Sequence, residues 1–271
     1  MPYSISTNDV IHNFKVNKIE EFPDFEMTGY SLTHLKTGAQ YFHLDSSDIS
    51  NAFVVHFKTP AYDNTGIFHI LEHLTLCGSK KYPIRDPFMN MTKRSLNSYM
   101  NAWTGPDFTM YPFATHNEKD FKNLLEVYMD ATFFPRLEYY DFLQEGWRYE
   151  FFEQTNDRSD LLFKGIVFNE MKGDMARQDT NFIHKLQSNV FNNNTYKFNS
   201  GGDPQFIPML SHTDVINAHN KYYHPRNSKF FTYGDLNFTE HLEYINDVLL
   251  QYLVDYPLEF QKFHTRKSKF L

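Results

Sequence analysis

Hydrophobic and polar residues alternate along the first part of the chain, which predicts strands before the first helix. Three segments carry the clearest alternation, at 30–35, 41–44 and 52–57. Lys36-Thr37-Gly38 supplies a turn signal between the first two, and Pro60 ends the third. We therefore expect the chain to begin with strands that pair in an antiparallel sheet.

Apolar residues spaced three and four positions apart predict helices in much of the remaining chain. Glu118–Phe133 is the clearest case. Further helices are expected from Asp86-Pro87, at 140–152, from Gly165, and at 179–191, 213–223 and 238–254, with one more strand at 229–234. This order predicts an α+β fold, in which an antiparallel-rich mixed sheet carries helices on one face. We expect a single domain over 1–271, with its core at 14–255 and a tail or linker start at 256–271.

A β-hairpin is predicted between these helices, with strands at 98–104 and 108–113. The turn between them contains Gly105-Pro106-Asp107. Pro112 predicts that the second strand is an edge strand or ends there, because proline donates no ladder hydrogen bond. An edge strand can bind an extended peptide by adding it to the sheet. A purely structural hairpin is an equally good interpretation of this segment.

Composition and charge narrow the function classes. Hydrophobic residues make up 41% and aromatic residues 18% of the chain, which is typical of an ordered globular protein. The formal net charge of -7 argues against a nucleic-acid partner. We also expect no membrane segment, because no run of about 18 apolar residues occurs. Cys77 is the one cysteine, so no disulfide can form within the chain, and the first residues resemble neither a secretory signal nor a transit peptide.

The strongest chemical signal is His69-x-x-Glu72-His73, which lies within an apolar helical run. Residues three and four positions apart share one face of a helix, so both histidines can hold one metal ion with Glu72 on the same side. This is the inverted zincin motif, in which two histidines bind zinc and the glutamate acts on the metal-bound water. Zinc with three protein ligands keeps a position for that water. The alternative is a buried helix whose histidines make ordinary hydrogen bonds.

A catalytic zinc with two histidines requires one further ligand, and carboxylates are available downstream at Glu145, Glu150, Glu153 and Glu170. The first three lie in or beside the helix expected at 140–152, where exposed glutamates are usual. Glu170 follows an apolar run in a segment that is expected to pack against the core, where a carboxylate needs a partner such as a metal. Spacing alone does not decide between them, because ligands meet in space.

Several multi-residue motifs extend this picture along the chain. They are His69-Ile-Leu-Glu-His73, the run from Leu76 to Phe88, Asn101-Ala102 before Thr109-x-Tyr111-Pro112-Phe113, Ala131-Thr-Phe-Phe-Pro135, Gln144-Glu-Gly-Trp-Arg148, the run from Gly165 to Gly173, Ser200-Gly-Gly-Asp-Pro204 and Tyr223-His-Pro-x-Asn227. Together they resemble the presequence protease branch of the pitrilysin (M16) zinc metallopeptidases. The likeness covers nearly the whole chain from about Phe14 onward.

The resemblance implies one Zn²⁺ per chain, bound by His69, His73 and Glu170, with Glu72 as the base. Glu150 is the competing third ligand, because other branches of the superfamily place theirs at about that distance. The substrate-binding residues implied are Asn101, Ala102 and Trp103 on the edge strand, and Leu76 and Phe88 in an apolar pocket beside the zinc. A phenylalanine is usual in the family where this chain has Trp103.

The resemblance also implies a zinc endopeptidase that degrades short unfolded peptides, such as cleaved presequences, in the mitochondrial matrix. Family members are several times longer, and this chain corresponds to their first domain only. The missing C-terminal half is therefore a possible partner as a separate chain. The alternatives are a non-catalytic peptide-binding or assembly subunit, and a fragment that is inactive without the later domains. A structural zinc site is disfavoured, because such sites favour cysteine ligands.

Overall fold

A nine-stranded sheet dominates the described residues of the structure, a computed structural model that describes residues 5–153 and 158–256. The sheet contains β1 (Val10–Ile11), β2 (Phe14–Phe22), β3 (Met27–His34), β4 (Gln40–Asp45), β5 (Asn51–Lys58), β6 (Asn97–Met100), β7 (Trp103–Thr104), β8 (Phe108–Thr115) and β11 (Ser228–Gly234). The strand order is β1-β2-β3-β4-β11-β5-β8-β6, and β7 also pairs with β8. Only the β11–β4 pair is parallel in this sheet.

The remaining elements within the described ranges are eight α-helices, four short 3-10 helices and a small hairpin. The helices are α1 (Ile67–Thr75), α2 (Pro87–Arg94), α3 (Glu118–Phe133), α4 (Tyr139–Glu145), α5 (Ile166–Met175), α6 (Gln178–Val190), α7 (His212–Tyr222) and α8 (Phe238–Asp255), and the hairpin pairs β9 (Arg148–Phe151) with β10 (Leu161–Lys164). The α+β prediction is confirmed. The tail expected at 256–271 lies outside the described residues except for Tyr256.

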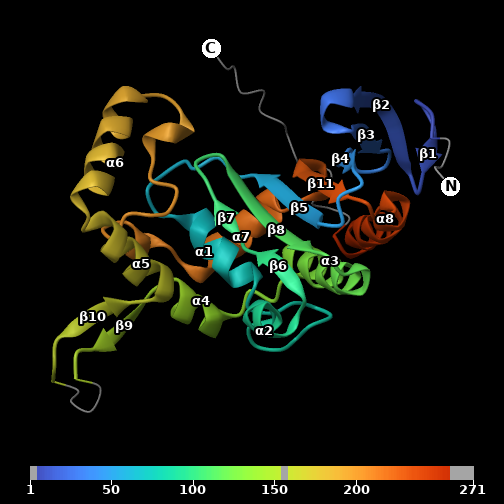
Figure 1. The fold of residues 1–271 in the computed structure, drawn as a ribbon. Helices are drawn as coiled ribbons and strands as arrows, with labels where there is room; N and C mark the ends of the chain where they lie inside the picture. The colour runs from blue at the N-terminus through green and yellow to red at the C-terminus, as the bar shows by residue number, and fades with distance from the viewer. Residues whose placement is uncertain (1–4, 154–157, 257–271) are drawn as a thin grey trace.

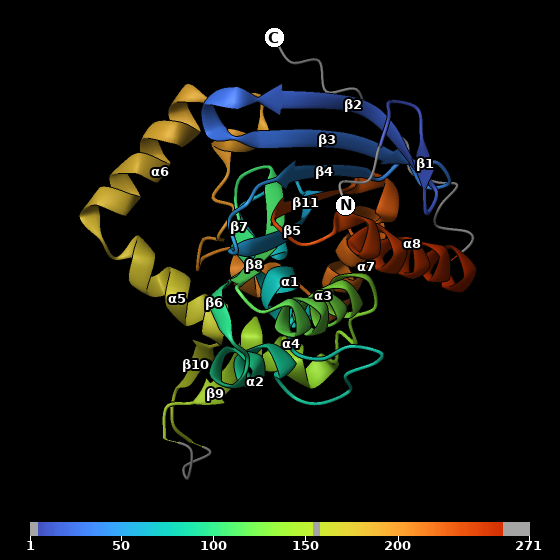
Figure 2. The same ribbon diagram turned by 45° about the vertical axis from the view of Figure 1, so that its right-hand side comes forward.

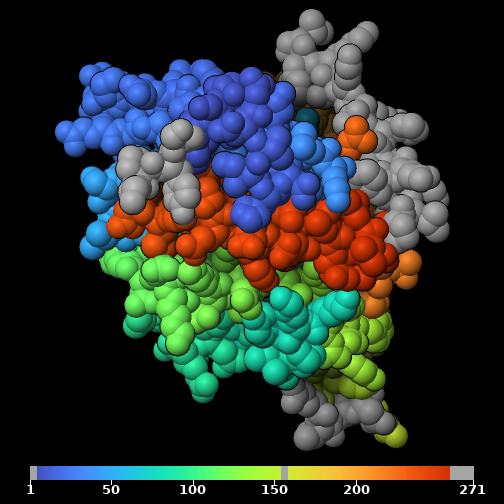
Figure 3. Space-filling model, turned by 90° about the vertical axis from the view of Figure 1, so that its right-hand side faces the viewer, coloured from blue at the N-terminus to red at the C-terminus, as the bar shows by residue number. Residues whose placement is uncertain are grey.

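The helices that cover the sheet, α1, α3, α7 and α8, pack on one of its faces, as the sequence predicts (Figures 1 and 2). In β5, Phe53, Val55 and Phe57 are fully buried, while the residues between them are half-buried. Phe113 of β8 packs edge-on against Phe121 of α3 on this buried face. Figures 1 and 2 show α1, α3, α7 and α8 on this side of the sheet, and Figure 3 shows α8 lying between the N-terminal strands and α3. The alternation of burial along the strands therefore follows from which face the helices cover.

Two predictions about individual elements are wrong. The segment 140–152 is not one helix: α4 ends at Glu145, Gly146 follows, and the chain continues as strand β9. Local helical spacing is overridden because the segment pairs with β10, which the sequence did not reveal. The sequence also missed β2, which is the longest strand and pairs with β3.

The expectation for Pro112 is also wrong, because β8 runs on to Thr115 and has partners on both sides. Pro112 is tolerated because its backbone nitrogen, which carries no hydrogen, faces the break between β6 and β7. At this break Asn101 N donates to Pro112 O at 3.1 Å, so the missing proline N–H lies opposite an interruption of the neighbouring strand. The hairpin itself is confirmed, and its first strand, not its second, lies at the edge of the sheet.

The α5–α6 segment and the β9–β10 hairpin extend away from the sheet (Figure 1). α6 has no buried residue, and Phe182, Ile183, Leu186 and Val190 on it are exposed. Among the described residues, no helix combines the length and the apolar character needed to cross a membrane.

Candidate metal centre and peptide-binding edge

The His69-x-x-Glu72-His73 motif lies on α1, and the apolar residues of α1 pack into the protein core. Ile70, Leu71 and Leu74 are fully buried, as expected for the face opposite the histidines. α1 begins after Gly66, whose φ of 67° lies in the left-handed region. A Cβ at this position would lie 2.5 Å from Gly201 O and 2.6 Å from Gly202 Cα. Glycine is therefore required here, both by the backbone conformation and by the close approach of a second loop.

His69, His73 and Glu170 come together at the open side of α1. Glu170 Oε2 lies 3.7 Å from His69 Nε2 and 3.9 Å from His73 Nε2. All three possible ligand atoms lie within 4.8 Å of one another. Tetrahedral zinc with bonds of about 2.0–2.1 Å places its ligand atoms about 3.4 Å apart. The three side chains thus fit one zinc ion after small movements, and Glu170, half exposed at 53%, has room to move.

Both histidine rings are oriented by a hydrogen bond from the nitrogen that faces away from this cluster. His69 Nδ1 donates to Gly201 O at 2.9 Å, and His73 Nδ1 donates to Glu145 Oε2 at 3.0 Å. With Nδ1 protonated, each Nε2 keeps a free lone pair for a metal. Burial lowers the pKa of His73, but the Glu145 hydrogen bond and the charges of three surrounding glutamates outweigh it and raise that pKa above its ordinary value.

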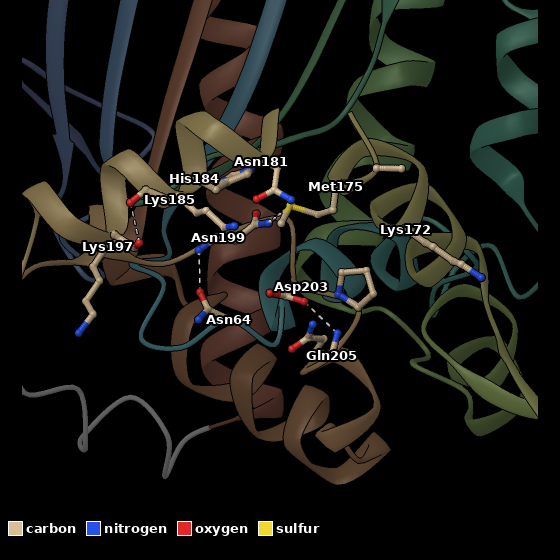
Figure 4. A pocket seen from close by; sticks show the side chains of 13 residues that line it. Asn64, Lys172, Met175, Asn181, His184, Lys185, Lys197, Asn199, Asp203 and Gln205 are labelled. Carbon is tan, nitrogen blue, oxygen red and sulfur yellow. Dashed lines mark hydrogen bonds between the residues drawn. The ribbon is translucent and has the colours of Figure 1, made fainter. Parts of the chain in front are cut away.

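The loop that supplies Gly201 is held by asparagine side chains. Asn64 Oδ1 accepts from Asn199 N at 2.9 Å, and Asn199 Oδ1 accepts from Gly201 N at 3.1 Å. Asn64 O also accepts from Asp203 N at 2.8 Å. Figure 4 shows Asn64, Asn199 and Asp203 at the wall of a polar cavity of about 560 Å³ beside α5 and α6. The residues just before α1 therefore fix the loop that orients His69.

Glu72 is 7% exposed and points toward the same cluster. Its Oε2 accepts a hydrogen bond of 2.6 Å from Thr104 Oγ1 on β7. Burial raises the pKa of Glu72, whereas the Thr104 hydrogen bond and the nearby His69 and His73 lower it. Burial outweighs the other contributions, so the pKa of Glu72 lies above its ordinary value. A cation held by the histidines would lower this pKa and favour the ionised carboxylate.

A cavity of about 360 Å³ connects the metal cluster with the sheet edge. Asn101, Ala102 and Trp103 line it together with the three candidate ligands and Glu72. Trp103 is 48% exposed, and its Nε1 donates to Tyr99 OH at 3.1 Å. Since β7 pairs only with β8 among the described strands, its outer side is open to an added strand.

A second cavity, of about 380 Å³, adjoins the first at Glu72 and His73. Leu76 and Phe88 line it, as the resemblance implies, and so do Met89 and Ile166. Glu145 and Asp86 add carboxylates to its wall. The size and apolar wall of this cavity therefore suit an apolar side chain.

The surroundings of the downstream glutamates differ from those expected from the sequence, although Glu170 lies at the metal cluster. Glu145 is 6% exposed and serves as the partner of His73, instead of being a solvent-exposed helix residue. Glu150 is on β9, paired with Arg148 and Lys164, and is not part of the three-residue cluster. The segment that carries Glu170 packs against the core as expected, but Glu170 itself is exposed. On α5 the core is reached by Val167, Phe168 and Met171.

Three residues that complete the site were missed from sequence: Glu145 as a histidine partner, Thr104 as a donor to Glu72, and Gly201 as a backbone acceptor. Each acts on α1 from a distant segment, so local patterns gave no signal. The one available hint was that Glu145 and Gly201 lie inside the multi-residue motifs.

Comparison with known proteins gives a consistent family likeness. The family model described as insulinase (peptidase family M16) matches residues 60–181. The mitochondrial presequence protease of Drosophila melanogaster is 44% identical over 253 residues, which cover 93% of this chain and 24% of that protein. The mitochondrial presequence protease of Danio rerio is 49% identical over 237 residues, covering 88% and 23% respectively. This chain thus spans about a quarter of the length of these relatives.

Solved structures share the fold at lower sequence identity. Pitrilysin matches with a TM-score of 0.68 and 17% identity, over 90% of this chain and 25% of its own. A protease from Helicobacter pylori matches with a TM-score of 0.65 and 20% identity, over 83% of this chain and 49% of its own. The resemblance to the pitrilysin-like M16 peptidases is therefore confirmed in both sequence and fold.

Proposed function

We propose that this chain, which resembles the presequence protease branch of the M16 metallopeptidases, is the zinc-binding domain of an endopeptidase that degrades short unfolded peptides. The observation that carries the proposal is the convergence of His69, His73 and Glu170 on one cavity with Glu72. The same cavity reaches the open edge of the sheet at Trp103. We further propose that residues 1–271 form a single domain, and that the metal is one Zn²⁺ per chain.

Different residues of this chain have different roles in the proposed peptide hydrolysis. His69, His73 and Glu170 would hold the ion, which when bound supplies an acidified water and polarises a carbonyl. Glu72 accepts a proton from the attacking water and passes it to the leaving amine. The β6–β7 edge aligns the peptide as an added strand.

The cavity at Leu76 and Phe88 then takes the peptide side chain beside the scissile bond. Presequences cleaved from mitochondrial precursors are suitable substrates, because they are short and unfolded. We accordingly propose the mitochondrial matrix as the location. Since the chain spans about a quarter of the length of its relatives, we also propose that a C-terminal part enters the full enzyme.

The test combines zinc content with cleavage of an internally quenched peptide, and compares the unmutated chain with Glu72→Gln. We expect one zinc per chain in both proteins and cleavage only by the unmutated chain. Glu150→Gln is a matched control, because Glu150 lies outside the metal cluster. It should retain both zinc and cleavage.

Each alternative gives a different result in this test. Zinc in both proteins without cleavage in either favours a peptide-binding domain, or an enzyme that needs its C-terminal part. Absence of zinc from both proteins would overturn the metal assignment. Equal cleavage by both would show that Glu72 is not the base.

A further inference from the structure

We infer that Thr104 is a positioning residue for Glu72, and that it ties the base carboxylate to the strand on which the peptide would lie. The assignment rests on the proposed function, because it gives Glu72 the role of the base. Thr104 lies on β7, outside the metal-binding motif of α1. Its hydroxyl group contacts the Glu72 carboxylate directly.

The Thr104 hydroxyl has two acceptors within reach and one proton to donate. Glu72 Oε2 lies 2.6 Å from Thr104 Oγ1, whereas Phe68 O lies 3.4 Å away. A short bond to a carboxylate is much stronger than a long bond to a neutral carbonyl. The proton is therefore directed to Glu72.

This bond fixes one oxygen of the carboxylate and leaves the other free. Among the described residues, Thr104 makes the one hydrogen bond recorded to the Glu72 carboxylate. Oε2 is thereby committed to β7, and Oε1 remains to accept a proton in the cavity. Without the hydroxyl, the carboxylate could rotate about its last side-chain bonds within a cavity of about 360 Å³. Catalytic groups need closely defined positions, so such rotation lowers the rate.

The strand that carries Thr104 is hydrogen-bonded to β8 on its inner side. Thr104 pairs with Thr109 of β8, and Gly105 N donates to Phe108 O at 2.8 Å. The turn that follows is also anchored, since Ala61 N donates to Pro106 O at 2.9 Å and Thr59 N donates to Asp107 O at 3.0 Å. The outer side of β7 has no partner strand among the described residues. A peptide added there and the Glu72 carboxylate would thus be positioned by the same two-residue strand.

The experiment uses Thr104→Val, which removes the hydroxyl and keeps the shape and the β-branching, and Thr104→Ser, which keeps the hydroxyl. Thr115→Val is the matched control, because Thr115 also lies on the hairpin and its two hydroxyl bonds, to Leu96 O and from Asn117 N, lie away from the site. Zinc affinity, kcat and KM for the quenched peptide are measured for each protein. We expect Thr104→Val to lower kcat at least tenfold while KM and zinc affinity change less than twofold. Thr104→Ser and Thr115→Val should stay within threefold of the unmutated kcat.

A kcat for Thr104→Val within twofold of the unmutated chain would overturn the inference. So would an equal loss in Thr104→Ser, which would indicate that packing and not the hydroxyl is required. If the unmutated chain does not cleave peptide, urea unfolding of the zinc-free proteins decides instead. We then expect the shifts in midpoint for Thr104→Val and Glu72→Leu to be strongly non-additive in the double variant, and additive shifts would refute the contact.

That second measurement also separates this inference from the proposed function. A chain that binds no zinc would contradict the proposed function. The coupling energy between Thr104 and Glu72 could still be measured in that chain, and its value would decide the positioning inference separately. A chain that binds zinc and cleaves peptide without dependence on the Thr104 hydroxyl would contradict only the positioning role.

Discussion

The carboxylate of Glu145 should control zinc affinity without touching the ion. Glu145 Oε2 accepts from His73 Nδ1 at 3.0 Å, and its other oxygen, Oε1, accepts from Gln144 Nε2 at 2.9 Å. The side chain is thus buried and held on both oxygens. Glu145→Gln keeps the shape and a carbonyl acceptor but removes the charge, whereas Glu145→Ala removes the partner of His73 altogether.

The expected magnitude follows from this geometry. A hydrogen bond to a charged group contributes about 1.5–3 kcal/mol, and each 1.4 kcal/mol corresponds to about a tenfold change in affinity. Loss of such an outer partner typically weakens metal binding about 10–100-fold. We therefore expect about tenfold weaker zinc binding for Glu145→Gln and about 100-fold for Glu145→Ala. His69 offers no compensation, since its own partner is the separate backbone carbonyl of Gly201.

Zinc affinity can be measured at fixed pH by competition with a chromophoric chelator. Glu170→Ala should show the largest loss, and Glu150→Ala should bind like the unmutated chain. Unchanged affinity in Glu145→Ala would refute the reasoning. A larger loss in Glu145→Ala than in Glu170→Ala would also refute it, because Glu145 would then be a direct ligand.

Further predictions concern two glycines, the apolar cavity and the buried histidines. Gly66→Ala should destabilise the chain by about 1–3 kcal/mol and weaken zinc binding, because its Cβ would displace the loop that holds His69; Gly173→Ala, in α5 with open space around it, should instead stabilise by about 0.5–1 kcal/mol in urea unfolding. Phe88→Ala should raise KM for peptides with a large apolar residue at the scissile bond and leave zinc affinity unchanged, and an unaltered preference would contradict the pocket assignment. Burial lowers the pKa of His43 to about 3, and those of His219 and His241 to about 4. Because the unfolded chain binds these protons first, unfolding free energy should be fully retained above about pH 6.5 and fall by about 1.4 kcal/mol per pH unit per histidine toward pH 4; equal stability at pH 7 and pH 5 would contradict this.

The sequence predicted those elements for which the local hydrophobic periodicity and the tertiary packing favour the same secondary structure. Glu118–Phe133 has an uninterrupted apolar face and an N-terminal cap from Asn117, and the structure has the helix with these bounds. Segment 140–152 failed because helical spacing continues across Gly146, while pairing with β10 decides the actual conformation. Pairing between separate strand segments cannot be predicted from the local sequence pattern of either segment.

The same distinction holds for the candidate site. His69, Glu72 and His73 were predictable because helix geometry alone brings them together. Glu170 was selected because it lies in a core-packing segment and in a motif that carries the family resemblance, and the structure places it at the cluster as an exposed side chain. Thr104 and Glu145 reach α1 from other segments, so their contacts depend on the tertiary fold.

The position of β11 in the sheet has a consequence for synthesis of the chain. β11 lies between β4 and β5, parallel to one and antiparallel to the other. Until Ser228–Gly234 emerges from the ribosome, β4 and β5 each expose an unpaired edge, and both edges belong to strands rich in aromatic residues. The nascent chain therefore passes through a long period in which its central strands can pair with other chains. A protein of this topology should depend on chaperones during translation more than its compact final form suggests.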